Sequence, residues 1–474
     1  MGKSAEIRMP GCVERAVERL GALGHEAYIV GGCVRDSLLG RAPKDWDVTT
    51  DAPPERIAEA FGDYRCLSHA EKYGTVTVVF DEMPVEITTY RIDGGYSDNR
   101  RPDTVAYTAS LREDLRRRDF TINALAYRHD AGVVDYFGGR RDLADGLIRC
   151  VGDARERFGE DALRILRALR FASRYDFCIE EGAAAAIHAL CRTLGGIAQE
   201  RVCAELTGIL TGNDAGGLFA EYPDVLCLCV PELRKAWEGG RLARALAAVR
   251  RAPPELAVRL ALLLREAVSA EAAAAKNAAF TENTVTAENG GPAEDADTAE
   301  NAAQILRRLR FDGGLIDTVK ALLRNFDAPI PTDAPAVKRR LNRLGEGRFL
   351  LLLAVRRASV DPDGAACGAA QSDPASGPAQ SGGAELSPAE RLAKIDRAAA
   401  LVSEILARGD CFSLKGLKVN GEKLKALGYA PGRKLGAALE TLLESVIAGG
   451  CPNEEQALAA MAERLLNRDC DLRD

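Results

Sequence analysis

The chain has 474 residues and a formal net charge of −7, and this length allows about two to four domains. It contains no run of about eighteen apolar residues, so no membrane-spanning helix is predicted, and its N-terminus has no hydrophobic signal core. The thirteen cysteines have no Cys-x-x-Cys spacing. This pattern argues against a zinc site and a disulfide framework, and it favours reduced thiols in a cytoplasmic protein.

The acidic charge is concentrated in one segment. Residues 266–303 contain eight acidic side chains and one lysine, which accounts for the whole net charge. The same segment is rich in Ala, Asn, Thr and Glu, and residues 361–386 are rich in Ala, Gly, Ser and Pro. Neither has enough large apolar side chains to offset the entropy lost on ordering, so we expect a disordered insertion at 266–303 and a linker at 361–386.

The first predicted elements in the chain are a strand, a turn and a helix. Ala27–Val30 is typical of a short apolar strand, Gly31 and Gly32 of a turn, and Cys33–Leu39 of a helix. Glycines let backbone N–H groups approach an anion closely, and the N-terminus of a helix carries a partial positive charge. These three elements therefore predict a phosphate site around Gly32.

Two aspartates follow these elements. Asp45 and Asp47, on either side of Trp46, are expected to lie on one strand and to point to the same face. Carboxylates placed in this way can hold Mg²⁺, with the remaining coordination positions left to water and substrate phosphates. A phosphate site next to a metal site predicts nucleotidyl or phosphoryl transfer. For either feature alone, the alternative is an ordinary turn followed by a solvated charged loop.

The string GGCVRDSLLGR followed by DWD resembles a known signature, GGxVRDxLLGRxxxDxD, of the class II nucleotidyltransferases of the DNA polymerase β superfamily. This group comprises the tRNA CCA-adding enzymes and the bacterial poly(A) polymerases. The resemblance implies that Asp45 and Asp47 bind two Mg²⁺ ions and that Gly32 and Arg35 position phosphates. An internal ion pair between Arg35 and Asp36 is the alternative for that arginine.

A mixed sheet is expected in the first 150 residues, with further strands at Thr75–Phe80, Val85–Tyr90 and Val133–Phe137. Glu86 falls on a strand that we expect to pair near that of Asp47. Related enzymes often place a third metal carboxylate there, and a structural salt bridge is the alternative. The polar, glycine-rich segment 92–104 resembles the flexible loop that family members need for adding A after C.

The segment LREDLRRRDFTINALAYR places two arginines and an aspartate before an apolar stretch. Arginine forks suit phosphate oxygens, and a nearby aspartate can accept a hydrogen bond from a ribose hydroxyl. The string RRDFTINA also resembles the second motif of the family. We therefore expect Arg117 and Arg118 to bind the nucleotide triphosphate and Asp119 to bind the ribose. A charged helix cap is the alternative.

The segment EDALRILRALRFASR resembles the EDxxR motif of the family, and its Asp161 and Arg164 are expected to share one helix face. Cytosine and adenine present an amino donor beside a ring nitrogen acceptor, whereas uracil and guanine present a carbonyl beside an N–H. A carboxylate that only accepts and a guanidinium that only donates therefore select C and A. Arg167 and Arg170 lie further round the helix, and we expect them to contact phosphate or the incoming RNA end. A surface ion pair is the alternative for Asp161 and Arg164.

The remaining sequence, from about residue 151, is rich in Ala, Leu and Arg, which predicts an all-helical region and an α+β protein as a whole. The expected order is a catalytic head, a helical neck, a helical body, a linker and a helical tail, at 1–150, 151–215, 216–360, 361–386 and 387–474. The body resembles a degenerate HD phosphohydrolase region. No histidine follows His188, so the usual metal site of that region cannot form.

The tail resembles the C-terminal part of the family over residues 411–450. Its basic side chains are suited to the RNA backbone, and the candidate contacts are Lys415, Lys418, Arg433 and Lys434. A solvated helical face is the alternative for any one of them.

The residues and the resemblance together predict an Mg²⁺-dependent enzyme. It would add CCA to the 3′ end of tRNA from CTP and ATP and release pyrophosphate. One alternative is a poly(A) polymerase, or an enzyme that adds only CC or only A, on the same fold. Others are a non-catalytic RNA-binding protein and a helical scaffold that uses its acidic insert for partners.

Overall fold

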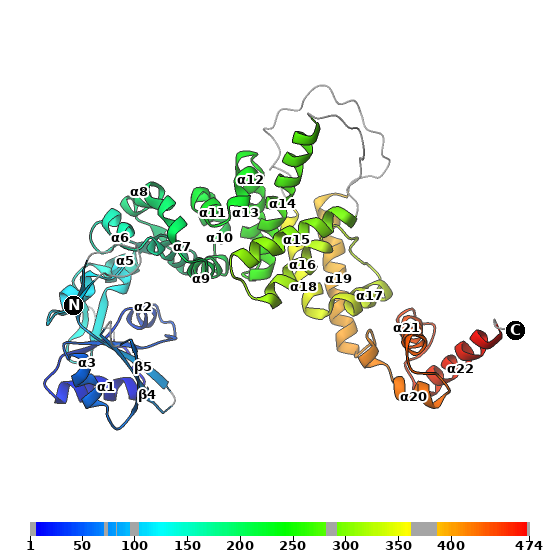
Figure 1. The fold of residues 1–474 in the computed structure, drawn as a ribbon, viewed down its shortest axis with the longest axis horizontal. Coiled ribbons are helices and arrows are strands. Elements are labelled where there is room, and N and C mark those ends of the chain that lie inside the picture. The colour runs from blue at the N-terminus through cyan, green and yellow to red at the C-terminus, as the bar shows by residue number, and fades with distance from the viewer. Residues whose placement is uncertain are drawn as a thin grey trace. The chain divides into compact units, whose positions relative to one another are not determined.

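The computed structural model of the protein describes residues 6–70, 74–81, 83–94, 104–280, 292–361 and 386–471. The chain forms two compact units, Met1–Pro231 and Glu232–Asp474. The first unit contains the main sheet and the second is helical (Figure 1). The predicted α+β class is therefore confirmed. The finer division into head, neck, body and tail stays a prediction.

The sheet of the first unit has seven strands in the order β3-β4-β5-β2-β1-β8-β9. Neighbouring strands are antiparallel except β2 and β5, which are parallel. The strands are β1 (Ala27–Val30), β2 (Asp47–Thr50), β3 (Arg65–Ala70), β4 (Thr75–Phe80), β5 (Met83–Thr89), β8 (Leu125–Arg128) and β9 (Gly132–Asp135). The strand predictions for Ala27–Val30 and Thr75–Phe80 are confirmed residue for residue.

The two faces of the sheet are covered differently because side chains alternate along each strand. One face packs against α1 (Gly11–Ala22) and α3 (Pro54–Ala60), and its core includes Val48 of β2 and Ile87 of β5 (Figure 1). Asp47 and Thr49, the neighbours of Val48, therefore point to the opposite face. This second face packs against α4 (Leu111–Arg116) in a smaller apolar cluster.

Some of the predicted boundaries differ from the structure. The helix after the glycine turn is α2 (Gly32–Leu38), one residue earlier than predicted, and β9 ends at Asp135 rather than at Phe137. The Asp135 carboxylate accepts hydrogen bonds from the backbone N–H groups of Phe137, Gly139 and Arg140, and this turn ends the strand. The expectation that Asp45 and Asp47 share a strand is wrong, because Asp45 lies in the loop before β2.

The rest of the first unit is mainly helical. Its site-forming helices are α6 (Ala154–Glu160), α7 (Leu163–Tyr175) and α9 (Gln199–Leu210), and α7 packs against α9. A two-stranded sheet joins β6 (Arg91–Asp93) to β7 (Val105–Tyr107). The predicted flexible loop, residues 92–104, begins in β6 and ends immediately before β7, and its residues 95–103 lie outside the described part of the chain.

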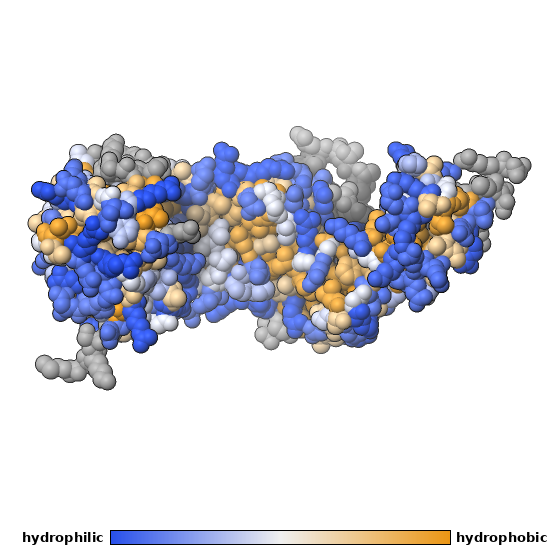
Figure 2. Space-filling model, turned by 90° about the horizontal axis from the view of Figure 1, so that it is seen from below, coloured by the Kyte–Doolittle hydropathy of each residue, from blue (hydrophilic) through white to orange (hydrophobic). Residues whose placement is uncertain are grey.

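The second unit consists of packed helices. They include α14 (Leu256–Phe280), α15 (Pro292–Arg308), α16 (Gly313–Arg324), α17 (Ala334–Leu344), α18 (Glu346–Ser359), α19 (Pro388–Arg408), α20 (Gly421–Ala426), α21 (Arg433–Ile447) and α22 (Glu455–Asp471). Hydrophilic side chains cover much of the surface in the view of Figure 2, and hydrophobic residues are visible among the helices. Over the described residues, no helix is both long and apolar enough to cross a membrane.

The prediction of a disordered insertion at 266–303 is wrong for most of that segment. Residues 266–280 continue α14, and residues 292–303 belong to α15. The reason is that alanine has the highest helix propensity and loses no side-chain entropy. On α15 the small side chains of Ala299, Ala302 and Ala303 are fully buried. Residues 281–291, and 362–385 of the predicted linker, lie outside the described residues.

Candidate active site

The first unit contains a cleft of about 590 Å³. Segments far apart in the sequence line it: the glycine turn after β1, the loop before β2, the residues after α4, and helices α7 and α9. It gathers nearly all of the site residues that the sequence predicts in this unit, namely Gly32, Arg35, Asp45, Asp47, Arg117, Arg118, Asp119, Asp161, Arg164, Arg167 and Arg170. Glu86 does not line it. The lining is strongly charged, with arginines facing carboxylates, and it suits a phosphorylated ligand.

The candidate metal ligands lie at the start of β2. Asp47 is the register partner of Glu86 in the parallel pair of β2 and β5, so both side chains leave the sheet on the same face. The predicted pairing of these two strands is confirmed. Burial and the negative charges of Glu86 and Asp45 raise the pKa of Asp47 to about 6, and Arg118 partly offsets them. This crowding of like charge is what a bound cation would relieve.

These carboxylates fit a divalent cation. No described residue makes a hydrogen bond or salt bridge to the carboxylate of Asp45, Asp47 or Glu86. Mg²⁺ is commonly held by one or two carboxylates together with water and substrate phosphates, so two aspartates suffice. Over the described residues, no three His, Cys, Asp or Glu side chains gather as a metal cluster. The role of Glu86 as a third ligand stays a prediction.

The glycine turn brings an arginine close to the backbone. Gly31 has φ of 81°, a conformation that favours glycine, and a Cβ atom at this position would lie 2.9 Å from Nη1 of Arg118. The turn therefore needs glycine for its backbone conformation, and a Cβ atom here would also force the guanidinium of Arg118 to shift. The predicted phosphate site around Gly32 lies beside this arginine.

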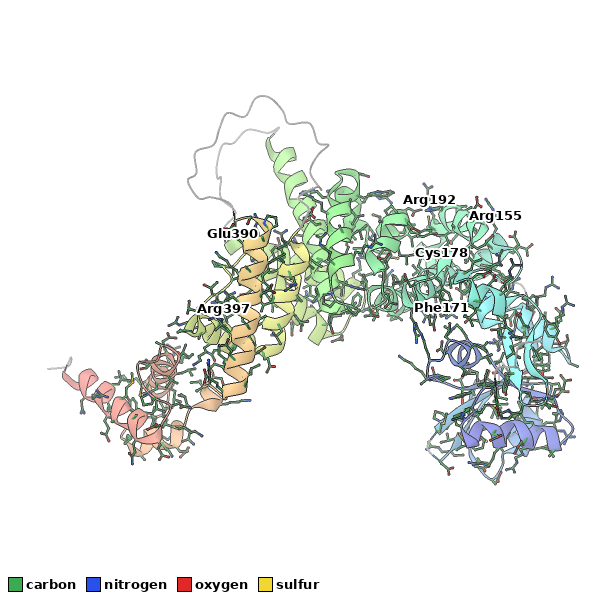
Figure 3. The ribbon with its side chains drawn as sticks, turned by 180° about the vertical axis from the view of Figure 1, so that it is seen from behind. Arg155, Phe171, Cys178, Arg192, Glu390 and Arg397 are labelled. Atoms are coloured by element: carbon green, nitrogen blue, oxygen red, sulfur yellow. The ribbon has the colours of Figure 1, made fainter. Side chains whose placement is uncertain are left out.

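Arg35 forms the internal ion pair that the sequence left as an alternative. Its Nη2 lies 2.8 Å from Asp36, and its Nη1 donates a hydrogen bond to Asn123. The guanidinium also lies over the rings of Phe171 and Tyr175, at 5.1 and 5.0 Å from their centroids (Figure 3 labels Phe171). These contacts tie α2 to α7. They are the contacts of a residue that stabilises the fold, and a phosphate contact of Arg35 stays a prediction.

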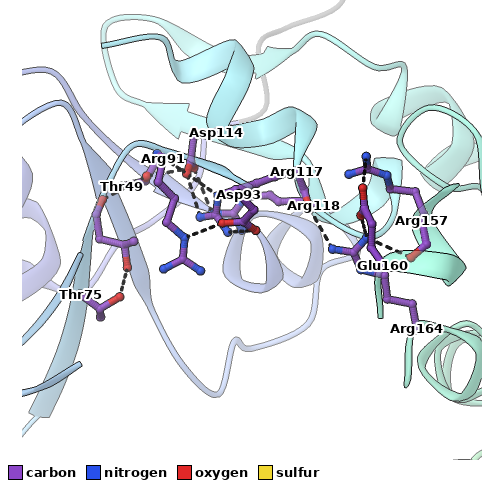
Figure 4. Close-up of polar contacts among 11 residues, drawn as sticks. Thr49, Thr75, Arg91, Asp93, Asp114, Arg117, Arg118, Arg157, Glu160 and Arg164 are labelled. Carbon is purple, nitrogen blue, oxygen red and sulfur yellow. Dashed lines mark hydrogen bonds and ion pairs between the residues drawn. The ribbon is translucent and has the colours of Figure 1, made fainter. Parts of the chain in front are cut away.

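Arg117 and Arg118 share one buried carboxylate, that of Asp114 (Figure 4). Arg117 donates to it through Nε and Nη2, at 3.0 and 2.8 Å, and Nη2 of Arg118 lies at 3.5 Å. Both arginines also line the cleft. They are thus held near the candidate metal ligands, as the predicted triphosphate contact requires.

Asp119 is buried and already has strong partners. Its carboxylate accepts hydrogen bonds from Arg167 at 2.7 Å, from Asn123 at 2.9 Å and from the backbone of Phe120 at 2.8 Å. Burial alone would raise the pKa of Asp119, but Arg167, Asn123 and Arg164 outweigh it and hold the pKa at about 2. A ribose hydroxyl at this carboxylate would share it with Arg167, and the ribose contact stays a prediction.

The candidate base-selecting pair does not have the helical geometry that the sequence suggested. Asp161 ends α6 in an extended conformation, and its Oδ1 accepts from the backbone N–H of Leu163 at 3.0 Å, while Arg164 lies inside α7. The expectation of one shared helix face is therefore wrong, because the chain bends between the two residues. Both side chains still line the cleft.

Each member of this pair is fixed by a further charged residue. Oδ2 of Asp161 lies 3.2 Å from Nη2 of Arg201 on α9. Nη1 of Arg164 donates to Glu160 at 2.6 Å, and Nη2 donates to the backbone carbonyl of Arg117 at 3.2 Å (Figure 4). The last contact links the candidate base-selecting arginine to the candidate triphosphate arginines.

The two remaining predicted arginines, Arg167 and Arg170, each form an ion pair with a carboxylate of another segment. Arg167 pairs with Asp119, and Arg170 pairs with Glu205 of α9 at 2.6 Å. Their predicted contacts with phosphate or RNA stay predictions.

Sequence reasoning missed several charged residues of the cleft: Lys44, Arg91, Asp93, Arg174 and Arg201. Arg174 continues the helical spacing of Arg167 and Arg170, so the sequence contained a signal for it. Arg201 comes from a helix about forty residues away in the chain, and only the packing of α7 on α9 brings it to Asp161.

The predicted RNA contacts of the tail are exposed. Lys415 lies in a short 3₁₀ helix, Lys418 follows it, and Arg433 and Lys434 begin α21. The same region has an apolar core that includes residues of α20, α21 and α22. Their role in RNA binding stays a prediction.

The poly A polymerase head domain family matches residues 27–149, a range that contains Gly31, both candidate metal aspartates and the arginines after α4. The matched range also contains the candidate metal and triphosphate residues of the cleft, whereas Asp161 and Arg164 lie beyond it. A second family, tRNA nucleotidyltransferase domain 2, matches residues 380–462.

The relatives with curated names are similar over less than half of the chain. The CCA-adding enzyme of Enterococcus faecalis is 43% identical over 224 residues, 47% of this chain and 55% of that protein. That of Leuconostoc mesenteroides is 47% identical over 192 residues, 40% of this chain and 47% of that protein. The chain therefore spans about half the length of the curated relatives it matches.

Solved structures are similar over nearly the whole chain. The Bacillus stearothermophilus CCA-adding enzyme in complex with CTP has a TM-score of 0.67 and 26% identity, covering 97% of this chain and 98% of that one. The Thermotoga maritima CCA-adding enzyme complexed with tRNA has a TM-score of 0.54 and 20% identity, covering 97% of each chain. At that identity the second comparison shows the fold alone.

Proposed function

We propose that the protein is a tRNA nucleotidyltransferase that adds C, C and A to the 3′ end of tRNA, using CTP and ATP and releasing pyrophosphate. The observation that carries this proposal is the cleft of the first unit. One cavity contains two aspartates suited to a divalent metal, paired arginines suited to a triphosphate, and an acidic and a basic side chain suited to the edges of C and A. The CCA-adding names of the curated relatives and of the Bacillus stearothermophilus structure support it.

Asp45 and Asp47 are proposed to hold two Mg²⁺ ions. When bound, these ions would supply Lewis acidity for the RNA 3′-hydroxyl and for the triphosphate. The hydroxyl would lose its proton to water, its oxygen would form a bond to the α-phosphorus, and the bond from the α-phosphorus to the bridging oxygen of the pyrophosphate would break. Arg117 and Arg118 bind the triphosphate oxygens and stabilise the charge that develops on the leaving pyrophosphate.

Asp161 and Arg164 are proposed to choose the base. The Asp161 carboxylate would accept the amino proton of C or A, and the Arg164 guanidinium would donate to the adjacent ring nitrogen. Uracil and guanine would place a carbonyl against the carboxylate and an N–H against the guanidinium, so neither side chain would form a hydrogen bond with the base. Arg201 and Glu160 hold the two side chains in fixed positions.

The basic residues of the second unit are proposed to contact the tRNA backbone. A-form RNA exposes phosphates and 2′-hydroxyls rather than sequence, so exposed lysines and arginines such as Lys415, Lys418, Arg433 and Lys434 suit it.

The experiment that tests the proposal offers purified protein and Mg²⁺ three tRNAs, ending before the first C, after one C and after both Cs. CTP and ATP are supplied singly and together. Addition of CCA followed by arrest supports the proposal. A long A tail would instead indicate a poly(A) polymerase, addition of C alone or A alone a partial enzyme, and no extension a binding protein.

Two variants locate the activity in the cleft. Asp45→Ala should eliminate extension while the protein still folds. Asp63→Ala is the matched control, because this exposed aspartate pairs with Arg19 at the surface, at 2.8 Å, and does not line the cleft. Extension by Asp45→Ala at the wild-type rate would refute the metal assignment.

A further inference from the structure

Asp114 is a buried acidic residue that the proposed reaction does not use directly. It lies on α4, its side chain is 0% exposed, and it does not line the cleft. A carboxylate removed from water in this way is strongly unfavourable unless it is well paired. The residues that pair with the Asp114 carboxylate therefore indicate the role of its charge.

The partners of Asp114 come from three elements of the first unit (Figure 4). Oδ1 accepts two hydrogen bonds from Arg117 and one from the backbone N–H of Arg91 on β6, the last at 3.3 Å. Oδ2 accepts from the hydroxyl of Thr49 at 3.1 Å and lies 3.5 Å from Arg118. The arrangement is that of a carboxylate saturated with donors.

The bond to Thr49 connects this cluster to the candidate metal site. Thr49 lies two residues after Asp47 on β2, so the two side chains point to the same face of the sheet. Arg118 provides a second connection, because its positive charge lowers the pKa of Asp47 while its guanidinium also lies beside Asp114. Arg118 thus interacts with one carboxylate that is buried, Asp114, and with another that lines the cleft, Asp47.

Asp114 does not use all the donors of the two arginines, and both side chains line the cleft. Arg117 uses Nε and Nη2 for Asp114, and its Nη1 lies 3.9 Å from Asp93, beyond hydrogen-bond distance. Nε of Arg118 is buried with no hydrogen-bond partner in the described structure. Both side chains are less than one-fifth exposed, at 16% and 19%, so their orientation is set by packing and by Asp114 rather than by solvent.

We propose that Asp114 is a positioning residue that orients Arg117 and Arg118 toward the triphosphate of the incoming nucleotide, and that Thr49 couples it to the strand of Asp47. This inference rests on the proposed function, because it assigns a triphosphate to the cleft. Asp114 itself touches neither substrate nor metal. Burial would raise the pKa of Asp114, but its arginine partners outweigh burial and lower the pKa, so the charged form is the one that orients them.

The test compares nucleotides that differ only in their phosphates. The dissociation constants of CTP and CMP are measured by calorimetry with the full chain, with Ca²⁺ as the divalent ion. The variant is Asp114→Asn, which keeps the shape and removes the charge. We expect it to weaken CTP binding at least tenfold while CMP binding changes less than twofold. Asp142→Asn is the matched control, because Asp142 is also a buried aspartate of the first unit, bonded to Thr121 at 2.6 Å, and lies away from the cleft.

Equal weakening of CTP and CMP by Asp114→Asn would mean a general structural role and would overturn the proposal, as would unchanged CTP binding. If this variant does not fold, Thr49→Val removes one bond to Asp114 and should weaken CTP about threefold with CMP unchanged. A Thr49→Val variant that binds CTP as tightly as wild type, or that weakens CMP binding as much as CTP binding, would also overturn the proposal. Wild-type protein that binds CTP more tightly than CMP but fails to extend tRNA would refute the proposed function alone. Wild-type protein that binds CTP no more tightly than CMP would refute both.

Discussion

The buried pair of Asp119 and Arg167 makes the stability of the first unit depend on pH. The pKa of Asp119 is held at about 2, against about 3.9 for an aspartate in an unfolded chain. A depressed carboxylate pKa contributes stability that is fully present above the unfolded pKa and is lost as the pH falls through the folded pKa. A pKa lowered this far corresponds to about 2–3 kcal/mol at neutral pH, lost progressively between about pH 4 and pH 2.

The perturbation that tests this reasoning is Asp119→Asn. Its unfolding in urea can be followed by the fluorescence of Trp46, which is buried in the first unit, in a Trp237→Phe background that removes the only other tryptophan. We expect the variant to be less stable than its parent by about 2–3 kcal/mol at pH 7 and the difference to shrink below pH 4. Asp63→Asn, an exposed aspartate paired with Arg19, should be nearly neutral at every pH.

A difference between Asp119→Asn and its parent that stays constant from pH 6 to pH 3 would refute the argument. So would a variant as stable as its parent at pH 7. Either result would mean that the carboxylate is not held charged by its arginine partners in the folded state.

Other expectations follow from local geometry. Gly31→Ala should weaken CTP binding and cost about 1–2 kcal/mol, because the added Cβ would lie 2.9 Å from Arg118 in a strained conformation. Its control in calorimetry and urea unfolding is Gly24→Ala, also at positive φ but with open space around it. Ala302→Asp should lower the melting temperature of the second unit, since it buries a charge on α15. Asn301→Asp, which places the same charge at an exposed position of that helix, should leave the melting temperature nearly unchanged. Replacing Lys415 and Lys418 together by Glu should weaken tRNA binding and make it less sensitive to salt, without changing CTP affinity, as measured by filter binding over a range of salt concentrations.

The sequence predicted those parts of the fold that depend on local patterns. The strand at Ala27–Val30 and the glycine turn are as expected, because strand patterns and turn chemistry act over a few residues. The pairing of the strands of Asp47 and Glu86 is also as expected, although it joins distant parts of the chain. The prediction of disorder for the alanine-rich segment 266–303 was wrong because it considered hydrophobicity alone. Low hydrophobicity suggested disorder, but alanine favours the helix, and the small side chains of Ala299, Ala302 and Ala303 are buried in α15.

The sequence predicted many of the residues of the candidate site but not the contacts between them. Motif spacing found Arg117, Asp161 and Arg164, and the structure brings them into one cleft. Motif spacing could not predict the contact of Arg201 with Asp161 or the hydrogen bond from Arg164 to the carbonyl of Arg117, because these contacts depend on how distant segments pack. The bend after Asp161 was missed because the EDxxR string has the spacing of a continuous helix.

The measurement that tests the central claim most directly is the rate of single-nucleotide addition to tRNA lacking CCA, with each of CTP, ATP, UTP and GTP offered alone. Wild-type protein should strongly prefer CTP at the first position, and Arg164→Ala should reduce the ratio of CTP to UTP addition by at least tenfold. Arg155→Ala, an exposed arginine of α6 labelled in Figure 3, should leave that ratio unchanged. Equal loss of rate with all four nucleotides in Arg164→Ala, and an unchanged ratio, would contradict the account.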